Sequence, residues 1–347
     1  MCIRDSCSKN ELLTRFKGLQ PTKLQGASCY TDAMVDDSRL VLRVLQESID
    51  DGGHALNYTK VKDLLLEDDE VCGVRIEDSD QSKCLELTAP VVINATGAWA
   101  DRLRNTVNKE KRIRPLRGSH IIIPKSLYPV TDVMTFLHQD DKRGVYVYPW
   151  EGTTVIGTTD LDHHEDLDIE ASISDEETKY LLDGFNSQFP NNVLTQDHIL
   201  STWAGVRPVI GAENSKNPSK ERRDHAVWTD KGLVTVSGGK LTTFRLIALD
   251  ALAAAESKLP SPKEFADDCM FPTPNVSSDS LLPENTSLAQ RLLGRYGEKA
   301  QILLENSTAN ERLTIEETEF SLAECRWAIR NEACLLYTSP SPRDPIG

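Results

Sequence analysis

The spacing of apolar residues divides this chain into segments with different periods. Residues 35–50 place apolar side chains at helical spacing after an acidic first turn, and the pattern predicts a helix that stops at the glycine pair 52–53. The short apolar run at 91–93, just before the turn ATG, is typical of a buried strand. The other elements expected in this part of the chain are strands in residues 54–67, 71–78 and 84–97 and a short helix beginning at 99–103.

From residue 113 onward, strand patterns separated by Pro, Gly or Asp dominate the sequence. They predict a mostly antiparallel sheet with helix cover over residues 113–210. One helix interrupts the sheet at 174–189, where Ser174 and Glu177 have the spacing of a capping box. The strands expected in this sheet are residues 118–123, 133–138, 144–148, 153–158 and 199–206.

A hairpin is indicated where the turn 230–232 separates the strand-like runs 225–229 and 233–236. The second strand leads into two glycines and then into a helix with Lys240 and Arg245 near its start. Unpaired N–H groups and the helix dipole favour negative charge at such an end, and glycines let a ligand approach the backbone closely. The segment is therefore a candidate site for a phosphate, or for an electron-rich ring that gains negative charge during a reaction.

The last part of the chain changes character again. Residues 260–283 are rich in Pro, Ser and Asp and predict a linker, followed by helical patterns at 287–295, 300–304 and 315–333. The terminal stretches MCIRDS and LYTSPSPRDPIG show neither period. We interpret both as foreign to the native protein, with disordered native termini as the alternative.

Composition narrows the function classes. The 39 basic and 54 acidic residues give a net charge of −15 without a dense basic run, which argues against a nucleic-acid partner. Eight scattered cysteines favour free thiols in a reducing compartment over disulfides or a zinc site. His163 and His164 lie among carboxylates, and we interpret them as part of a solvated loop, so no metal is expected. No apolar run approaches the length of a membrane span or a secretory signal.

Four glycine-flanked turns at strand ends carry the candidate chemistry. They are ATGAW at 95–99, GTTD at 157–160, GVRP at 205–208 and GGKLTT at 238–243. Each turn alone is a weak signal, because glycine turns are common. Their order and spacing together favour a functional site.

A resemblance to a known family rests on RPLRGSHIIIP, YPWEGTTVIGTTD, WAGVRPVIG and VTVSGGKLTTFR, with YTDAMVDDSRLVL and VVINATGAWADRL in support, and runs from about Leu24 to Leu335. In these motifs the sequence resembles the FAD-dependent, respiratory, quinone-linked glycerol-3-phosphate dehydrogenases of the glycine/D-amino-acid oxidase-like flavoprotein group. The sequence contains no GxGxxG, the turn with which this family holds the FAD pyrophosphate. The resemblance therefore implies a fragment that lacks the N-terminal GxGxxG segment.

The fold implied by the resemblance is α/β (mixed α+β). It comprises an incomplete FAD-binding Rossmann-like domain, an antiparallel-sheet substrate domain and a C-terminal helical module. The expected divisions are a non-native terminus at 1–10, a partial FAD-binding domain at 24–112, the substrate domain at 113–210, a segment returning to the FAD domain at 211–258, a linker at 259–283, a truncated helical module at 284–335 and a non-native tail at 336–347.

The activity implied by the resemblance is the oxidation of sn-glycerol 3-phosphate to dihydroxyacetone phosphate. Hydride passes to FAD and electrons then pass to a quinone, although oxygen-using relatives leave the acceptor open. Two alternatives remain: an amine or amino-acid oxidase of the same flavoprotein group, and an inactive fragment that cannot hold FAD. We expect the fragment alone to be inactive.

The resemblance also assigns residues. Arg207 and Lys240 match substrate- and flavin-facing cations, and His120 matches a position near the site, so these three are the catalytic candidates. Ordinary roles stay open for each of them: a surface salt bridge, an exposed helix lysine and a core histidine. Asp160 either orients a cation or caps its turn. The cofactor-binding candidates are Val61, Ala95, Thr96, Gly97, Gly238, Gly239, Lys240, Leu241 and Thr242.

The partners implied are glycerol 3-phosphate and a quinone, with no nucleic acid. The implied location is the cytoplasm, peripheral on the inner face of the cell membrane. A homodimer is compatible with the sequence, which does not determine the oligomeric state.

Overall fold

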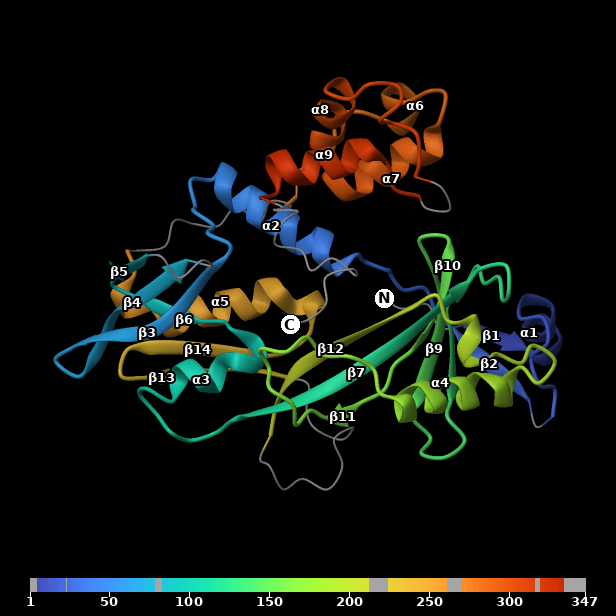
Figure 1. Cartoon of the computed structure of the whole chain (residues 1–347), viewed down its shortest axis with the longest axis horizontal. Coiled ribbons are helices and arrows are strands. Elements are labelled where there is room, and N and C mark those ends of the chain that lie inside the picture. Colours follow the sequence, from blue (N-terminus) through green and yellow to red (C-terminus); the bar gives the residue numbers. More distant parts are fainter. Residues whose placement is uncertain are drawn as a thin grey trace. The chain divides into compact units, whose positions relative to one another are not determined.

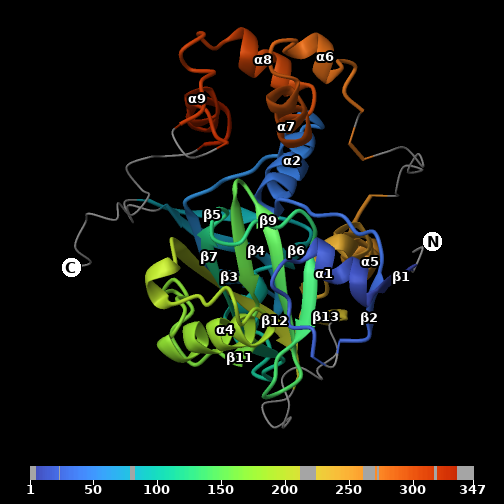
Figure 2. The same cartoon turned by 90° about the vertical axis from the view of Figure 1, so that its right-hand side faces the viewer.

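The chain forms two compact units in the computed structural model, which describes residues 5–22, 24–78, 83–211, 224–260, 270–271, 273–315 and 319–333. The first unit comprises Met1–Asp32 and Thr59–Lys263, and the second comprises Ala33–Tyr58 and Glu264–Gly347. Figure 1 and Figure 2 show the elements of both units in two views. The sheets belong to the first unit and the second unit is helical.

A six-stranded antiparallel sheet is built around the long strand β7 (Ile113–Pro124), as the sequence predicts. Strand β12 pairs with β7 over ten residues on one side, and β10 and β11 share its other side. Strands β7 and β12 run beside each other through the middle of Figure 1. The other strands of this sheet are β8 (Met134–Leu137), β9 (Gly144–Trp150), β10 (Thr153–Gly157), β11 (Leu161–Asp162) and β12 (Ser201–Ile210).

One face of this sheet is covered by helix α4 (Asp175–Gln188), which begins at the predicted capping box of Ser174 and Glu177. Phe185 and Phe189 are fully buried there together with Ile121 and other strand residues. The first described residues add to the same core through β1 (Asp5–Ser8), α1 (Lys9–Arg15) and β2 (Gly26–Cys29), and the short 3-10 helix η2 (Gln196–His198) precedes β12. The opposite face is partly open, since Trp203 of β12 is 37% exposed and Tyr146 of β9 is 42% exposed.

A smaller sheet combines parallel and antiparallel pairing. Strands β6 (Val92–Asn94) and β14 (Leu233–Gly238) are parallel, and β13 (His225–Asp230) pairs with β14 as the predicted hairpin. Lys231 and Gly232 have φ of 47° and 80°, which two-residue hairpin turns of the primed type require. Flanking this sheet are η1 (Gly97–Trp99), α3 (Ala100–Arg104), η4 (Leu241–Thr243), α5 (Phe244–Ala254) and η5 (Glu256–Lys258).

A three-stranded meander packs against the smaller sheet. Its strands are β3 (Thr59–Glu67), β4 (Glu70–Asp78) and β5 (Cys84–Thr88), paired in that order. Leu64 and Val71 of the meander bury themselves with Leu233 of β14 in one cluster. The meander thus supports the outer side of the hairpin.

The second unit holds five helices among its described residues. Leu292 and Tyr296 of α7 pack with Leu303 of α8 in its core, and Arg39 of α2 forms an ion pair with Glu332. The helices are α2 (Asp37–Asp50), α6 (Ser278–Leu281), α7 (Thr286–Tyr296), α8 (Lys299–Glu305) and α9 (Leu322–Asn331).

Several sequence predictions are wrong in extent or environment. The helix predicted over 315–333 begins only at Leu322, because Ser321 and Glu324 form a capping box there. Strand β12 continues past residue 206, since its pairing with β7 extends to Ile210. The side chain of His163 is 6% exposed, so the solvated-loop interpretation fails for that residue. The short helix α6 lies inside the predicted linker.

Parts of several predicted divisions lie outside the described residues. These are residues 1–4, residues 79–82 of the partial FAD-binding domain, residues 212–223 of the returning segment, residues 261–269 and 272 of the linker, residues 316–318 and 334–335 of the helical module, and the whole tail 336–347. The domain boundaries stay predictions. In the structure, helix α2, which lies within the predicted FAD-binding domain 24–112, belongs to the second unit together with the C-terminal helices.

Candidate functional site

The parallel strands β6 and β14 lie side by side, with Asn94 at the end of β6 paired with Thr235, and each strand continues into a glycine turn. Ligands of open α/β sheets bind outside the carboxyl ends of parallel strands. The hydroxyl of Ser237 donates to the carbonyl of Gly97 at 3.4 Å, which joins the two turns. The turns 95–99 and 238–243 predicted from the sequence therefore lie together.

Buried polar side chains hold the first turn in place. Asn94 is 1% exposed; its amide donates to the carbonyl of Ala100 at 3.0 Å, and its oxygen accepts from the hydroxyl of Thr96 at 2.7 Å. Gly97 has φ of 59°, and a Cβ built on it would meet no atom within 4 Å. The backbone at Ala95–Gly97 is thus fixed, partly exposed and beside open space.

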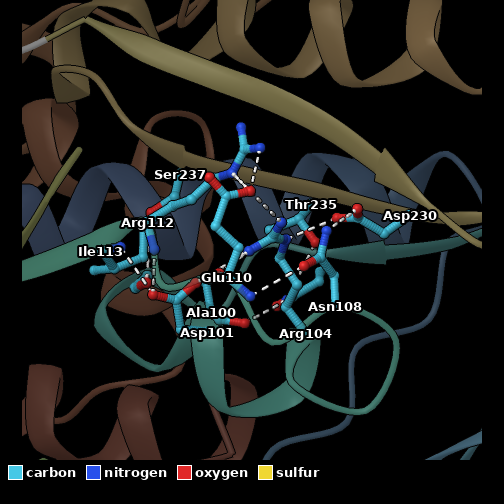
Figure 3. A network of polar contacts seen from close by, with 12 residues as sticks. Ala100, Asp101, Arg104, Asn108, Glu110, Arg112, Ile113, Asp230, Thr235 and Ser237 are labelled. Carbon is cyan, nitrogen blue, oxygen red and sulfur yellow. Dashed lines mark hydrogen bonds and ion pairs between the residues drawn. The ribbon is translucent and has the colours of Figure 1, made fainter. Parts of the chain in front are cut away.

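A network of polar contacts anchors the following helix α3 (Figure 3). The guanidinium of Arg104 is 1% exposed and donates to Asp230 at 2.7 Å, and Asn108 donates to the other oxygen of Asp230 at 2.6 Å. Burial would raise the pKa of Asp230, but these donors outweigh it and lower the pKa. One oxygen of Asp101 accepts from the backbone N–H groups of Arg112 and Ile113, both at 2.8 Å, at the start of β7.

In the second turn, Gly238 and Gly239 are needed for backbone conformation and packing. Gly238 and Gly239 have φ of 78° and 82°. A Cβ on Gly238 would lie 2.8 Å from Ile210, and one on Gly239 would lie 2.6 Å from Ile247. These two glycines are therefore required by the left-handed backbone and by the packing of the chain on itself, whereas Gly97 in the first turn faces open space.

The helix after this turn begins with N–H groups for which the helix itself supplies no acceptor. The N–H groups of Leu241 and Thr242 lie in the first turn of a continuous helical segment, where no carbonyl of the helix can reach them. Lys240 precedes them and is exposed. This end of the helix can receive negative charge.

The second part of the site lies on the open face of the large sheet. The register pairs Trp203 with His120, Gly205 with Gly118 and Arg207 with Leu116. Side chains alternate between the faces of a strand, so Trp203, Gly205 and Arg207 share the face that carries His120. This face is opposite to that of Ile121 and Ile123, which pack with α4.

Arg207 lies flat on the sheet. Its guanidinium donates to Asp160 at 3.2 Å and to the hydroxyl of Thr158 at 3.1 Å. A Cβ built on Gly118 would lie 2.4–2.6 Å from three guanidinium atoms, so a side chain at position 118 would displace the guanidinium. The side chain is 34% exposed and can meet an anion from solvent.

The imidazole of His120, on strand β7, lies on the same face of the sheet as Arg207. Its ring lies over Gly157, where a built Cβ would be 2.1 Å from Cδ2, and its centroid is 5.1 Å from the ring of Trp203. Burial, helped by the positive charge of Arg207, lowers the pKa of His120 to about 4. The imidazole is therefore uncharged at neutral pH.

A buried carboxylate of helix α4 supports the site from the opposite face of the sheet. Glu177 of α4 is 2% exposed and accepts from the hydroxyls of Ser119 and Thr159 at 2.9 and 2.5 Å, and it pairs with Arg117 at 2.9 Å. Burial alone would raise the pKa of Glu177, but the hydrogen bonds and Arg117 lower it. The carboxylate fixes the strand segments that precede His120 and Asp160.

The structure brings most of the predicted residues into two neighbouring groups. His120, Asp160 and Arg207 form the group on the open sheet face. Residues 95–97 and 238–242 form the group at the parallel strand ends. Strand β12 meets the second group where Ile210 contacts Gly238. The convergence of Arg207 and Lys240 beside a flavin stays a prediction.

Other residues of the site were not anticipated or lie elsewhere. Val61 is 37% exposed on β3, beside a register shift in its pairing with β4, and its cofactor role stays a prediction. Sequence reasoning missed Trp203, although WAGVR alternates so that Trp203 and Arg207 share a face. It also missed the role of Glu177 beneath the sheet, because a capping box explains this residue fully at the sequence level.

The fold and this pair of glycine turns define a class of protein. The model of the FAD dependent oxidoreductase family, DAO, matches residues 4–248. The match covers more than half of the chain, so the chain belongs to this family, whose cofactor is FAD. The flavoprotein group expected from the motifs is confirmed.

Individual relatives sharpen the comparison. The aerobic glycerol-3-phosphate dehydrogenase of Bacillus subtilis is 36% identical over 248 residues, covering 71% of this chain and 44% of the relative. That of Staphylococcus haemolyticus is 33% identical over 256 residues, 73% of this chain and 46% of the relative. The crystal structure of glycerol-3-phosphate dehydrogenase from Bacillus halodurans with FAD superimposes with a TM-score of 0.74 at 26% identity, over 86% of this chain and 62% of that chain. This chain thus spans less than half the length of the two curated relatives.

The residues present fit the ring-facing side of an FAD site. The fixed backbone at 95–97 borders open space, and the N–H groups of Leu241 and Thr242 would face the part of the ring that gains charge. The motif for the pyrophosphate is absent from the sequence. In the part of the chain that the structure describes, no helix has the length and apolar content to cross a bilayer.

Proposed function

We propose that this chain is the flavin- and substrate-facing part of an FAD-dependent glycerol-3-phosphate dehydrogenase. The observation that supports this most directly is the pair formed by the Arg207 guanidinium and the uncharged His120 imidazole on one open sheet face. The relatives that match at 33–36% identity carry the name of this activity. Their substrate is an anion with a secondary hydroxyl. Arg207 is suited to the anionic phosphate, and His120 is suited to the hydroxyl.

The chain's own residues account for binding and proton transfer. Arg207 binds the phosphate or stabilises the alkoxide that develops as the C2 hydroxyl loses its proton. His120 has a lone pair that accepts this proton, since its imidazole is uncharged. FAD held beside the turns 95–97 and 238–242 would supply the acceptor for the hydride of C2, and the product would be dihydroxyacetone phosphate. Lys240 adds positive charge at the helix start, where reduction makes the ring more negative.

The finer parts of the proposal concern the intact protein. We propose that a quinone takes the electrons and that the protein associates peripherally with the inner face of the cell membrane. Neither step requires a spanning helix. Oxygen as the acceptor is the alternative that a direct oxidase assay distinguishes.

The test joins this chain to the part of the Bacillus subtilis relative that precedes its match to this chain, where the family resemblance places the GxGxxG turn. The chimaera is reconstituted with FAD and mixed anaerobically with glycerol 3-phosphate, glycine or sarcosine. Bleaching of the flavin absorbance by glycerol 3-phosphate alone is expected. Bleaching by glycine or sarcosine instead would replace the proposal with an amino-acid oxidase. A folded chimaera that holds FAD and reacts with none of the three would refute it.

A further inference from the structure

A row of residues across the open sheet face determines where the imidazole of His120 lies. The register pairs His120 with Trp203 on β12 and with Gly157 on β10, and pairs Gly157 in turn with Tyr146 on β9. All four positions share one face. Because Gly157 has no side chain, it leaves a gap between the aromatic residue of β12 and that of β9.

The imidazole fills this gap. A Cβ built on Gly157 would lie 2.1, 2.6 and 2.7 Å from Cδ2, Cγ and Nε2 of His120. Cγ is bonded directly to the Cβ of His120 and Cδ2 is the next atom, so the overlap involves the base of the ring as well as Nε2, and the whole ring would have to move. Trp203 closes the other side with its ring 5.1 Å away and inclined by 38°. The ring of His120 is therefore held between a glycine and an indole.

The charge of the His120 ring depends on the charged groups near it, and the described residues supply a cation and its paired carboxylate. Arg207 on β12 is the cation that acts on it, and Asp160 after β10 is bound to Arg207. Tyr146 faces it from β9, across Gly157. The Nδ1 atom of His120 is buried and has no hydrogen-bond partner among the described residues. An imidazolium there would leave a buried N–H donor unsatisfied, next to a guanidinium.

We propose that Trp203 and Gly157 are positioning residues that keep the His120 imidazole flat on the sheet, shielded from water and uncharged. The catalytic use of that state, a lone pair kept available for the substrate hydroxyl, rests on the proposed function. The state itself belongs to this chain without cofactor or substrate. Trp203 supplies the apolar wall, and Gly157 supplies the space.

The test measures the imidazole directly by NMR in the full chain labelled at histidine, with the His120→Gln variant to assign its signal. In the unaltered chain the His120 signal is expected to titrate well below the ordinary midpoint of about 6.5. Trp203→Ala is expected to raise the midpoint by about one pH unit or more, because water reaches the ring. Trp203→Phe keeps an aromatic wall and is expected to retain most of the depression.

Gly157→Ala provides the second arm, with Gly144→Ala as its matched control. Gly144 also lies in a strand of this sheet, and a Cβ there would make an ordinary contact of 3.5 Å with Thr135. Gly157→Ala is expected to move the His120 ring signals and raise the midpoint, and Gly144→Ala to change neither. An ordinary His120 midpoint in the unaltered chain would overturn the proposal, even if every variant failed to fold. Equal midpoints in the unaltered chain and a folded Trp203→Ala or Gly157→Ala variant would overturn it too.

The same variants in the FAD-reconstituted chimaera report the consequence. The acid limb of the pH profile of kcat/KM should move upward with Trp203→Ala and stay in place with Gly144→Ala. A chimaera that does not oxidise glycerol 3-phosphate would refute the proposed function and leave the NMR result intact. An unmoved acid limb in an active Trp203→Ala chimaera would show that His120 is not the group that titrates in the reaction.

Discussion

At the scale of single residues, two missing side chains shape the site. Gly118 lies beneath the guanidinium of Arg207, and Gly157 lies beneath the ring of His120. Both polar groups can therefore lie flat on the sheet beside each other. The positions of an arginine and a histidine are thus determined by residues that have no functional group themselves.

Gly118→Ala tests the first of these positions. The new methyl group would overlap the guanidinium, which must leave Asp160 and Thr158. We expect kcat/KM of the chimaera for glycerol 3-phosphate to fall by about tenfold or more, equivalent to roughly 1.4 kcal/mol of transition-state stabilisation. Gly144→Ala is the control, and equal activity of the two variants would contradict the expected displacement.

Glu177→Gln tests the buried carboxylate. Removing its charge leaves Arg117 without its buried partner, and we expect a loss of about 3 kcal/mol in the free energy of unfolding at neutral pH. The folded-state pKa of Glu177 is lowered, so its charge stabilises the fold above the unfolded pKa near 4.5 and this contribution disappears as pH falls further. Urea titrations at neutral and acidic pH should therefore show a smaller difference between variant and parent in acid. A constant difference would indicate that the charge is not involved.

At the scale of elements, helix α3 is joined to the β13–β14 hairpin by the network of Figure 3. Arg104 provides the central contact, since its guanidinium reaches Asp230 in the hairpin and the carbonyl of Glu110 in the segment before β7. Asp101 of the same helix fixes the first residues of β7. The small sheet and the long strand of the large sheet are thus positioned by one short helix.

Arg104→Ala is expected to destabilise the chain by about 3–5 kcal/mol, because it leaves Asp230 without its buried cation. Arg102→Ala in the same helix is the matched control. Arg102 forms ion pairs with Asp166 and Asp168, but its side chain is 46% exposed, so a loss below about 1 kcal/mol is expected. Denaturant midpoints of both variants decide, and similar losses would contradict the distinction between buried and exposed pairs.

The sequence predicts elements better than it predicts their neighbours. Local signals such as the Ser174 capping box and the 230–232 turn locate helix α4 and the hairpin, because capping and turn chemistry act within a few residues. The full extent of β12 depends on a partner more than eighty residues away, so local pattern ends it too early. The contact of His120 with Gly157 and Trp203 likewise depends on three strands and has no local signal.

At the scale of the whole molecule, the first unit exposes apolar residues around the parallel strand ends. Ile93 of β6 is 40% exposed, and Leu246 and Leu249 of α5 are 53% and 36% exposed. Trp99 of η1 is 41% exposed. Ile93 and Trp99 lie within two residues of the turn 95–97 that would face the cofactor ring, and α5 follows the turn 238–243. The sequence has no GxGxxG to hold the pyrophosphate.

Measurements of FAD binding test whether this chain holds the cofactor without a GxGxxG turn. A ligand stabilises a protein according to its concentration relative to Kd, and here the phosphate contacts of the family motif are missing. We expect FAD at about ten times the protein concentration to stabilise this chain by less than about 1 kcal/mol, and the chimaera to bind it tightly and turn yellow. Thermal melts with and without FAD, together with absorbance after gel filtration, provide the measurement. A tightly bound flavin in the unextended chain would contradict the expectation.

Gly118 and Gly157 also set a limit for anyone who would redirect this scaffold to another alcohol by laboratory evolution. Libraries that randomise positions 118 and 157 will yield mostly inactive clones, since any added carbon there collides with a polar group of the site. Diversity is better placed at Gly205, where an added Cβ meets no atom within 4 Å. Changes at that position can alter the space available to a bulkier or smaller alcohol while the arginine and histidine stay where they are.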